Sequence, residues 1–367
     1  MPVQGFYFDG NMMLSNLIRS DVQAWKAYAV ANVPADFIKL DAMELPYRFP
    51  EEMQRELAAK LAAAPMNLYP NVASCGLQGL LREAFDIPGQ AEIALGNGSD
   101  ELIQLMTLLL AKPGAVMLAL EPSFVMYRHN AGLFGMEYVG VSLNPDFSMN
   151  LAAVLEAIRM HQPTLIFLAY PNNPTGVMFE RAQVEAILDA APGVVVVDEA
   201  YGSFSGDSFL PLAGQSKNLV VMRTLSKIGF AGLRMGYACG HPALMSELAK
   251  IVPPYNMNQL SLAAAAYALQ HRDWVEEKVS LLKQERARVA QALSALPNTE
   301  VFASEANFIT IRVPDAQAVF DALKADKILV KKLHGVHPLL EQCLRLTIGT
   351  PEQNDRVLAV LRRAQSL

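Results

Sequence analysis

Short apolar runs alternate with amphipathic segments through the middle of the chain. The apolar runs are bounded by polar or glycine-containing turns and cover residues 92–96, 115–120, 136–141, 164–169, 194–197 and 218–222. The segments between them repeat apolar positions at helical spacing, for example over residues 100–111, 151–160 and 181–190. Continuous apolar strands that alternate with helices predict a mostly parallel sheet that is buried on both faces.

This pattern changes near residue 255, just after Pro253 and Pro254. Two long helical stretches follow, and then short strands and helices to the C-terminus. We therefore predict an α/β fold: a large domain with a mostly parallel seven-stranded sheet flanked by helices, plus a smaller α+β domain. The large domain is expected over residues 46–255 and the small one over residues 256–367. Residues 1–45 lack a strong period and are expected to form an N-terminal arm and part of the small domain.

The composition is that of an ordinary globular protein, with 52% hydrophobic and 18% charged residues. The net charge is −6 and no long block of Lys or Arg occurs, which argues against a nucleic-acid partner. Charges interrupt every apolar stretch well short of a membrane span, and no signal pattern stands at the N-terminus, so we expect a cytoplasmic protein. Cys75, Cys239 and Cys343 are far apart and show no metal-ligand spacing, which predicts free thiols and no metal site.

A lysine, Lys227, follows the last apolar strand in a segment rich in hydroxyl-bearing and small residues. Thr224 and Ser226 precede it, and Arg234 lies seven residues beyond it. A lysine whose pKa is lowered by burial or by a neighbouring cation carries a free amine that can form a Schiff base with an aldehyde. Thr224, Ser226 and Arg234 are candidate hydrogen-bond donors for a phosphate beside this amine.

Two turns upstream offer further polar groups at strand ends. Gly98, Ser99 and Asp100 leave a strand and open a helix, where backbone N–H groups and the helix dipole favour an anion. An ordinary helix cap would explain the same residues. Asn173 lies in the turn Asn-Asn-Pro-Thr-Gly of residues 172–176, which is either an ordinary turn or part of a site.

A carboxylate and an aromatic ring stand at two other strand ends. Four valines, residues 194–197, lead into Asp198, and the burial of a lone carboxylate predicts a cationic partner for it. Tyr201 follows in the motif Asp-Glu-Ala-Tyr. Phe124 follows Glu121-Pro122-Ser123 and would either stack on a planar ring or fill the core.

From about Leu40 to the C-terminus, these motifs in this order resemble the fold-type-I, pyridoxal 5'-phosphate-dependent aminotransferases, in the subgroup that contains histidinol-phosphate aminotransferase. The motifs are Asn-Asn-Pro-Thr-Gly, Asp-Glu-Ala-Tyr and Ser-Lys followed by Gly-Leu-Arg-x-Gly. The resemblance implies that Lys227 forms the internal aldimine and moves protons, and that Asp198 pairs with the ring nitrogen. Asn173 and Tyr201 would hydrogen-bond the ring hydroxyl oxygen, and Phe124 would stack on the ring.

The resemblance also implies the residues around the cofactor phosphate and the assembly of the protein. Gly98, Ser99, Asp100, Thr224, Ser226 and Arg234 would surround the phosphate. Tyr69, in Leu-Tyr-Pro, would reach the phosphate from the neighbouring subunit, which implies a homodimer.

For the substrate, the resemblance implies four residues. Arg345, in Leu-Arg-Leu-Thr-Ile-Gly-Thr, would bind the substrate anion, a carboxylate or a phosphate, and Lys331 stands where many relatives place an arginine for the substrate phosphate. Tyr47 and Asn173 would contact the substrate as well. The implied ping-pong reaction interconverts L-histidinol phosphate plus 2-oxoglutarate and imidazole-acetol phosphate plus L-glutamate.

Three alternatives stay open from the sequence. Two share the fold: a broad-specificity aromatic aminotransferase and a phosphothreonine decarboxylase. The third is a cofactor-sensing regulator of another class, which would need a basic DNA-binding module, and the chain shows no basic stretch that predicts one.

Overall fold

The computed structural model describes residues 17–27, 33–71 and 76–364, and the chain divides into two compact units, residues 1–35 and 36–367. In the first unit, the described residues form a short helix, α1 (Ser20–Ala24). Residues 1–16 and 28–32 of the predicted arm lie outside the described residues. The second unit holds both sheets of the protein, and the domain boundaries near residues 45 and 255 stay a prediction.

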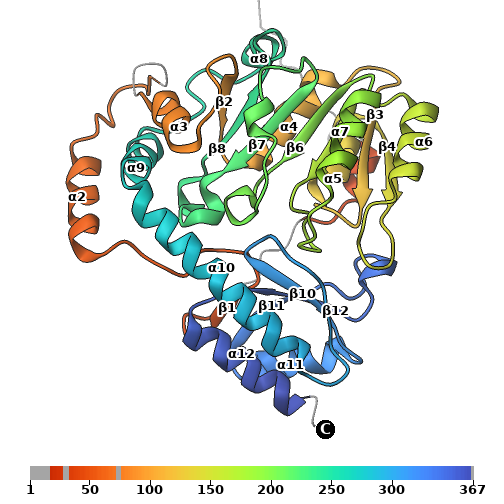
Figure 1. Ribbon diagram of the computed structural model, residues 1–367. Coiled ribbons are helices and arrows are strands. Elements are labelled where there is room, and N and C mark those ends of the chain that lie inside the picture. Colours follow the sequence, from red (N-terminus) through yellow and green to blue (C-terminus); the bar gives the residue numbers. More distant parts are fainter. Residues whose placement is uncertain (1–16, 28–32, 72–75, 365–367) are drawn as a thin grey trace, which may run out of the picture. The chain divides into compact units, whose positions relative to one another are not determined.

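A seven-stranded sheet in the second unit has the strand order β2-β8-β7-β6-β5-β3-β4 (Figure 1). The pairs from β7 to β4 are parallel, whereas β8 runs antiparallel to both β2 and β7. This mostly parallel sheet, with helices on its faces, confirms the predicted α/β class. The strands are β2 (Glu92–Gly96), β3 (Val116–Glu121), β4 (Glu137–Ser142), β5 (Leu165–Ala169), β6 (Val194–Asp198), β7 (Leu219–Thr224) and β8 (Gly236–Gly240).

Alternate residues of each central strand pack into different apolar clusters. Val196 of β6 packs in the cluster that contains α4 (Ser99–Leu110), α5 (Met126–Phe134) and α8 (Pro242–Ala249). Val195 and Val197 pack in the other cluster, to which the remaining helices around this sheet contribute; these are α3 (Leu77–Phe85), α6 (Leu151–His161), α7 (Arg181–Ala190) and α9 (Gln259–Gln270). Because both faces are covered, Val195, Val196 and Val197 are fully buried, as the apolar pattern predicted, whereas Val194 at the start of the strand is partly exposed.

The strand β8 was missing from the strands predicted from the sequence. Its residues, Gly-Tyr-Ala-Cys-Gly, follow the lysine segment without an extended apolar run, yet all five are buried. Gly236 is required here, because a Cβ at this position would lie 2.7 Å from the carbonyl carbon of Gly98 and 2.8 Å from the nitrogen of Ser99. The glycine thus lets β8 approach the start of α4 closely.

A second, five-stranded sheet has the order β1-β11-β12-β10-β9. Its strands are β1 (Ile38–Leu40), β9 (Glu300–Val301), β10 (Phe308–Arg312), β11 (Ile328–Lys332) and β12 (Cys343–Thr347). The remaining helices are α2 (Glu51–Ala62), α10 (Arg272–Ser294), α11 (Ala316–Ala325) and α12 (Pro351–Ala364). Leu344 and Leu346 of β12 are buried with apolar residues of α10, α11 and α12. Arg345, which lies between them, therefore faces the opposite side of this sheet.

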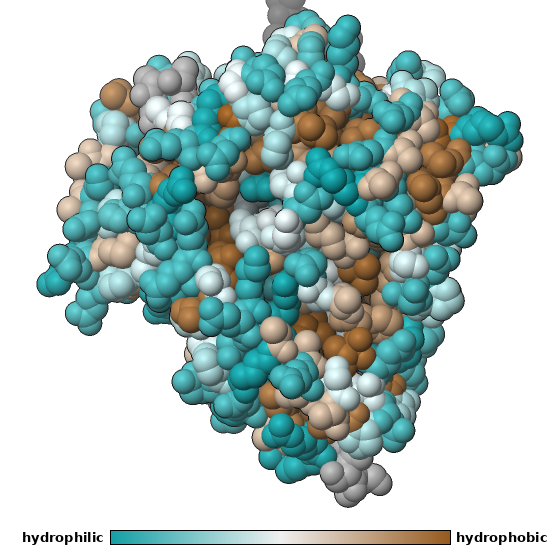
Figure 2. All heavy atoms as spheres, in the orientation of Figure 1, coloured by the Kyte–Doolittle hydropathy of each residue, from teal (hydrophilic) through white to brown (hydrophobic). Residues whose placement is uncertain are grey.

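The surface drawn in Figure 2 is mostly hydrophilic, and apolar side chains form separate patches on it. Large exposed apolar side chains occur close together in the sequence at Met66 (67% exposed), Leu68 (61%) and Tyr69 (80%). The Tyr69 ring stacks on Tyr255, which is 58% exposed, with the ring centroids 4.7 Å apart. Two large rings stacked in an exposed position are typical of a surface that another protein covers.

Candidate active site

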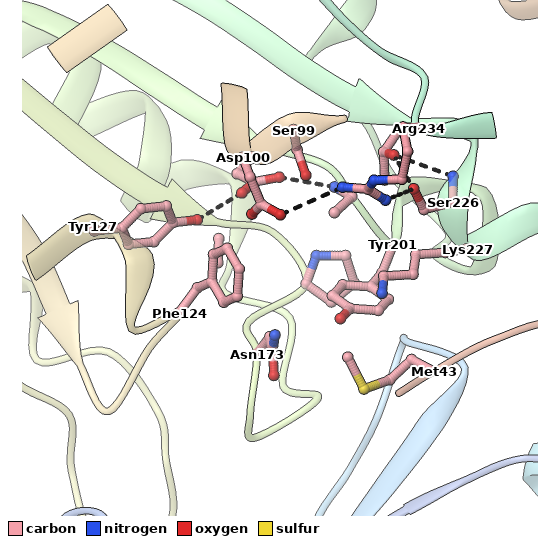
Figure 3. Close-up of a pocket in the computed structure, with 15 residues that line it drawn as sticks. Met43, Ser99, Asp100, Phe124, Tyr127, Asn173, Tyr201, Ser226, Lys227 and Arg234 are labelled. Carbon is pink, nitrogen blue, oxygen red and sulfur yellow. Dashed lines mark hydrogen bonds and ion pairs between the residues drawn. The ribbon is translucent and has the colours of Figure 1, made fainter. Parts of the chain in front are cut away.

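The carboxyl ends of β3, β5, β6 and β7 and the start of α4 surround a cavity of about 100 Å³ (Figure 3). Most of the predicted site residues line it, namely Ser99, Asp100, Phe124, Asn173, Asp198, Tyr201, Thr224, Ser226, Lys227 and Arg234. They come from segments far apart in the sequence, and the parallel sheet brings them to one edge. The cavity is also lined by Met43, Tyr127, Ala169, Pro171 and Ala200, which the sequence-based site did not include.

Lys227 projects into this cavity from a short 3₁₀ helix, η4 (Leu225–Ile228), that directly follows β7. The Thr224 side chain caps the helix by accepting a hydrogen bond from the Ser226 nitrogen (3.1 Å), and Gly229, with φ of 109°, ends it. The Lys227 ammonium donates to the Ala42 carbonyl oxygen (3.2 Å). Burial, with a smaller effect from the positive charge of Arg345, lowers the pKa of Lys227 to about 8. A substantial fraction of this side chain is therefore a free amine near neutral pH.

Asp198, the last residue of β6, is 4% exposed and accepts two hydrogen bonds. The Ala200 N–H donates to Oδ1 (3.1 Å) and the Tyr127 hydroxyl donates to Oδ2 (2.7 Å). Burial raises the pKa of Asp198 to about 6. The cationic partner predicted for this carboxylate is not found: within the part of the chain that the structure describes, Asp198 forms no ion pair. Neutral donors hold it instead, and a cation from a bound molecule would complete its environment.

The part of the cavity at the start of α4 is suited to an anion. Ser99 and Asp100 are in the first turn of α4, so the positive end of the helix dipole points toward this part of the cavity. Arg234 adds a guanidinium that lies 3.4 Å from the Ser226 hydroxyl and 3.6 Å from the Asp100 carboxylate. Gly98, which precedes the helix, does not line the cavity, but a Cβ there would lie 2.5 Å from the Arg234 guanidinium. Glycine at this position therefore leaves room for the arginine.

Aromatic and amide groups complete the lining of the cavity. Phe124 packs edge-on against Tyr127, with the ring centroids 5.8 Å apart. Tyr201 is 3% exposed, and burial raises the pKa of its hydroxyl well above the usual value, so the hydroxyl stays protonated. The Asn173 side-chain oxygen accepts a hydrogen bond from Arg345 (2.5 Å) and thus connects the cavity to the five-stranded sheet.

Arg345 and Lys331 occupy paired positions on adjacent antiparallel strands. Lys331 of β11 is the direct register partner of Arg345 of β12, and side chains at such positions lie on the same face. Thr310, the partner of Arg345 on β10, donates to the Pro174 carbonyl oxygen (2.6 Å), which places this face against the turn that carries Asn173. Arg345 also donates to the Asp41 carbonyl oxygen (2.9 Å). Two cations therefore share the face of the sheet that is directed at the site.

Two predicted residues lie elsewhere. Tyr47 lines a different cavity, of about 310 Å³, together with Phe49, Phe230 and Trp274, and its role as a substrate contact stays a prediction. Tyr69 is exposed and does not line the site cavity of the described chain. Tyr69 is expected to reach the cofactor phosphate of a neighbouring subunit. Its place in a single chain therefore does not test this role.

Met43 and Tyr127 are the two lining residues with the clearest structural roles that the sequence did not reveal. Met43 has φ of 55°, and its backbone is fixed by Thr347, which accepts from the Met43 nitrogen (3.1 Å), and by Asn307, which donates to the Met43 oxygen (3.0 Å). Only these long-range contacts reveal its position. Tyr127 lies three residues after Phe124, and this spacing puts both side chains on one side of a helical turn. The spacing was the signal in the sequence that could have placed Tyr127 beside Phe124 at the site.

Cys239 and Cys343 are buried free thiols, and Cys75 lies outside the described residues. Among residues 17–27, 33–71 and 76–364, no three His, Cys, Asp or Glu side chains come together as a metal site. No helix in these ranges is long and apolar enough to span a membrane.

Comparisons with known proteins agree with the geometry of the site. The family model of aminotransferase class I and II matches residues 35–361. The chain is 62% identical over 351 residues to a histidinol-phosphate aminotransferase of Neisseria meningitidis serogroup C, covering 95% of this chain and 96% of the relative. It is 54% identical to a histidinol-phosphate aminotransferase of Chromobacterium violaceum, covering 96% of this chain and 99% of the relative.

A solved structure, histidinol-phosphate aminotransferase from Sinorhizobium meliloti in complex with pyridoxal-5'-phosphate, superposes with a TM-score of 0.80 at 24% identity. The superposition covers 90% of the present chain and 91% of the Sinorhizobium meliloti chain. At 24% identity, this likeness supports the fold alone. The family expected from the motifs is confirmed by the match over residues 35–361 and by the close relatives. The chain belongs to the family of class I and II aminotransferases.

Proposed function

We propose that the protein is a pyridoxal 5'-phosphate-dependent histidinol-phosphate aminotransferase, which interconverts L-histidinol phosphate plus 2-oxoglutarate and imidazole-acetol phosphate plus L-glutamate. The observation that carries the proposal is the 62% identity, over nearly the full length of both chains, to a relative of that name. The cavity around Lys227 supports it with chemistry that suits transamination.

The residues of the cavity fit the cofactor at three points. The start of α4, Ser226 and Arg234 offer donors and positive charge for a phosphate. The buried carboxylate of Asp198, held by neutral donors, suits a protonated ring nitrogen. Lys227, with its lowered pKa, suits an aldehyde. We expect Phe124 to stack on the ring and Asn173 and Tyr201 to bind the ring hydroxyl oxygen.

When bound, pyridoxal phosphate supplies an electron-withdrawing ring that accepts the electron pair released at the substrate Cα. The side chains supply binding and proton transfer. The Lys227 amine would remove the proton from the substrate Cα and deliver it to the cofactor carbon that receives the amino group, C4', as a general base and then a general acid. The negative charge of Asp198 would hold the proton on the ring nitrogen. Arg345 would fix the anionic group of the substrate, the α-carboxylate of glutamate or the phosphate of histidinol phosphate, by bidentate pairing.

Lys331 supports the choice of a phosphorylated substrate. Arg345 would pair with the anion that either substrate offers, the α-carboxylate of glutamate or the phosphate of histidinol phosphate, which has no carboxylate, so it does not select between them. Lys331, on the same face of the sheet, would add the second positive charge that a phosphate group requires. An aromatic substrate such as phenylalanine has no group that uses this charge.

Replacing Lys331 by alanine should raise the KM for histidinol phosphate about tenfold and leave the KM for glutamate unchanged. The expected loss corresponds to one charge-assisted hydrogen bond. Steady-state kinetics with each substrate measures the difference. Lys332→Ala, one position along the same strand, is the matched control, because its side chain lies on the other face, where it contacts Gln317. An equal rise for both substrates in Lys331→Ala would contradict the selective role.

The lowered pKa of Lys227 predicts how the protein without cofactor captures pyridoxal phosphate. Only the neutral amine attacks an aldehyde, so the rate of capture should rise with pH and reach half of its maximum near pH 8. Stopped-flow absorbance between pH 6 and pH 10 follows this rate. A half-maximum near pH 10.5, the value of an ordinary lysine, would contradict the effect of burial.

Product analysis tests the proposed reaction against the two rivals on the same fold. Incubation with histidinol phosphate and 2-oxoglutarate should form glutamate, whereas phosphothreonine should release no carbon dioxide. Glutamate formation that is faster with phenylalanine would favour the broad-specificity aromatic aminotransferase. Release of carbon dioxide from phosphothreonine would favour the decarboxylase.

We also propose that the protein is a homodimer. The exposed apolar side chains of Met66, Leu68, Tyr69 and Tyr255 support this proposal, since a second copy of the chain would cover them. The expected mass in solution is twice the 40.1 kDa of the chain, which light scattering measures. A mass of one chain at micromolar concentration would contradict the homodimer.

The cytoplasmic location expected from the sequence stays a prediction.

A further inference from the structure

Tyr127 of α5 is held rigidly against the end of β6. Its side chain is fully buried, and its ring stacks on Phe167 of β5 with the centroids 4.6 Å apart and the planes 7° apart. Phe124 packs on it edge-on, with the planes at 86°. The ring therefore has aromatic neighbours on two sides, and its hydroxyl is directed at Asp198 Oδ2, 2.7 Å away (Figure 3).

The direction of this hydrogen bond follows from the chemistry of both groups. Burial raises the pKa of the Tyr127 hydroxyl well above its usual value, and the negative charge of Asp198 raises it further. The proton therefore stays on Tyr127, which donates to the carboxylate. The Ala200 N–H occupies the other oxygen, so each carboxylate oxygen has one donor from the protein.

We propose that Tyr127 is a positioning residue for Asp198: its hydroxyl stabilises the ionised carboxylate and fixes its orientation toward the cavity. The inference rests on the proposed function, because the ionised Asp198 matters to the enzyme through the ring nitrogen of pyridoxal phosphate. It adds a residue of the cavity lining that acts through Asp198.

The other groups around Asp198 explain why this donor is needed. Asp100 of α4 and Glu199 of the same chain segment are negative and disfavour ionisation. Tyr201 is neutral, and the positive groups that line the same cavity, Lys227 and Arg234, form no ion pair with Asp198 in the described chain. The two neutral donors are thus the favourable direct contacts of this buried charge. Loss of one of them should shift the ionisation of Asp198 to higher pH.

Tyr127→Phe tests this proposal, with Tyr237→Phe as the matched control. Both changes remove one hydroxyl from a fully buried tyrosine, but the Tyr237 hydroxyl interacts with Arg223 and not with Asp198. The readout is the C=O stretching band of a protonated carboxyl in infrared difference spectra, recorded against pH on the protein without cofactor. The band that disappears in Asp198→Asn belongs to Asp198.

The midpoint of the Asp198 band should lie near pH 6 in the unmodified protein and in Tyr237→Phe, and about one unit or more higher in Tyr127→Phe. An unchanged midpoint in Tyr127→Phe would overturn the proposal. If Tyr127→Phe does not fold, 3-fluorotyrosine at position 127 replaces it. Its more acidic hydroxyl donates more strongly and should lower the midpoint, whereas an unchanged or higher midpoint would overturn the proposal.

A second arm separates failure of this inference from failure of the proposed function. Equilibrium dialysis with pyridoxal phosphate at pH 7 should show binding about tenfold weaker in Tyr127→Phe than in Tyr237→Phe. Equal affinities would contradict the role of Tyr127 in the holoenzyme. Absence of binding to the unmodified protein would refute the proposed function, whereas the infrared result would still decide whether Tyr127 controls Asp198.

Discussion

Lys227→Ala should lower the turnover number of transamination by about 10⁴-fold or more, because it removes the amine that we propose as both the cofactor-binding group and the general base. The residue is placed for these tasks by the turn after β7, where Thr224 and Gly229 fix the short helix that carries it. The variant should also lose the visible absorbance that pyridoxal phosphate acquires in the enzyme. Single-turnover kinetics and absorbance spectroscopy measure the two effects.

Lys250→Ala is the matched control for Lys227→Ala. Lys250 is an exposed lysine that pairs with Glu247 and does not line the site cavity, and its loss should leave the turnover number unchanged. A Lys227→Ala enzyme that retains both the absorbance and more than about a hundredth of the activity would refute the assignment of Lys227 as base.

Asp198→Asn should lower the turnover number by about 10²- to 10³-fold and change the KM for glutamate much less. The amide keeps the size of the side chain but carries no negative charge to hold a proton on a ring nitrogen, and such an electrostatic contribution acts mainly in the transition state. Steady-state kinetics at saturating cofactor measures both constants.

Asp207→Asn is the matched control for this change. Asp207 also accepts a hydrogen bond from a tyrosine, Tyr170 (3.0 Å), but it pairs with Arg181 and does not line the site cavity. We expect the turnover number of Asp207→Asn to stay within about twofold of the unmodified enzyme. The residue does not line the site, and a partly exposed ion pair contributes little to the stability of the fold. Equal losses in both variants would contradict a specific electrostatic role for Asp198.

The sequence predicted those features that depend on local pattern. The apolar runs predicted β6 and β7. Asp198, the last residue of β6, and Lys227, which follows β7, line one cavity at the carboxyl ends of these parallel strands. The strand β8 was not predicted, because its burial comes from its place between β2 and β7 and its sequence begins and ends with glycine.

Features set by long-range contacts could not be read from the sequence. A buried carboxylate indicated a cation beside Asp198, but the chain supplies the hydroxyl of Tyr127 from another helix. Met43 reaches the cavity only because Asn307 and Thr347, more than 260 residues away, fix its backbone. Tyr47, a substrate contact by resemblance, lines a different cavity, and its role stays a prediction.

The central claim is that Lys227 and the paired cations Arg345 and Lys331 serve transamination of a phosphorylated amino compound. The most direct measurement is a single-turnover experiment in which enzyme loaded with pyridoxal phosphate is mixed separately with L-histidinol phosphate, L-glutamate and L-phenylalanine. The account predicts rapid conversion of the spectrum to that of the pyridoxamine form with the first two and slow conversion with phenylalanine. Conversion with phenylalanine that is as fast as with histidinol phosphate would contradict it.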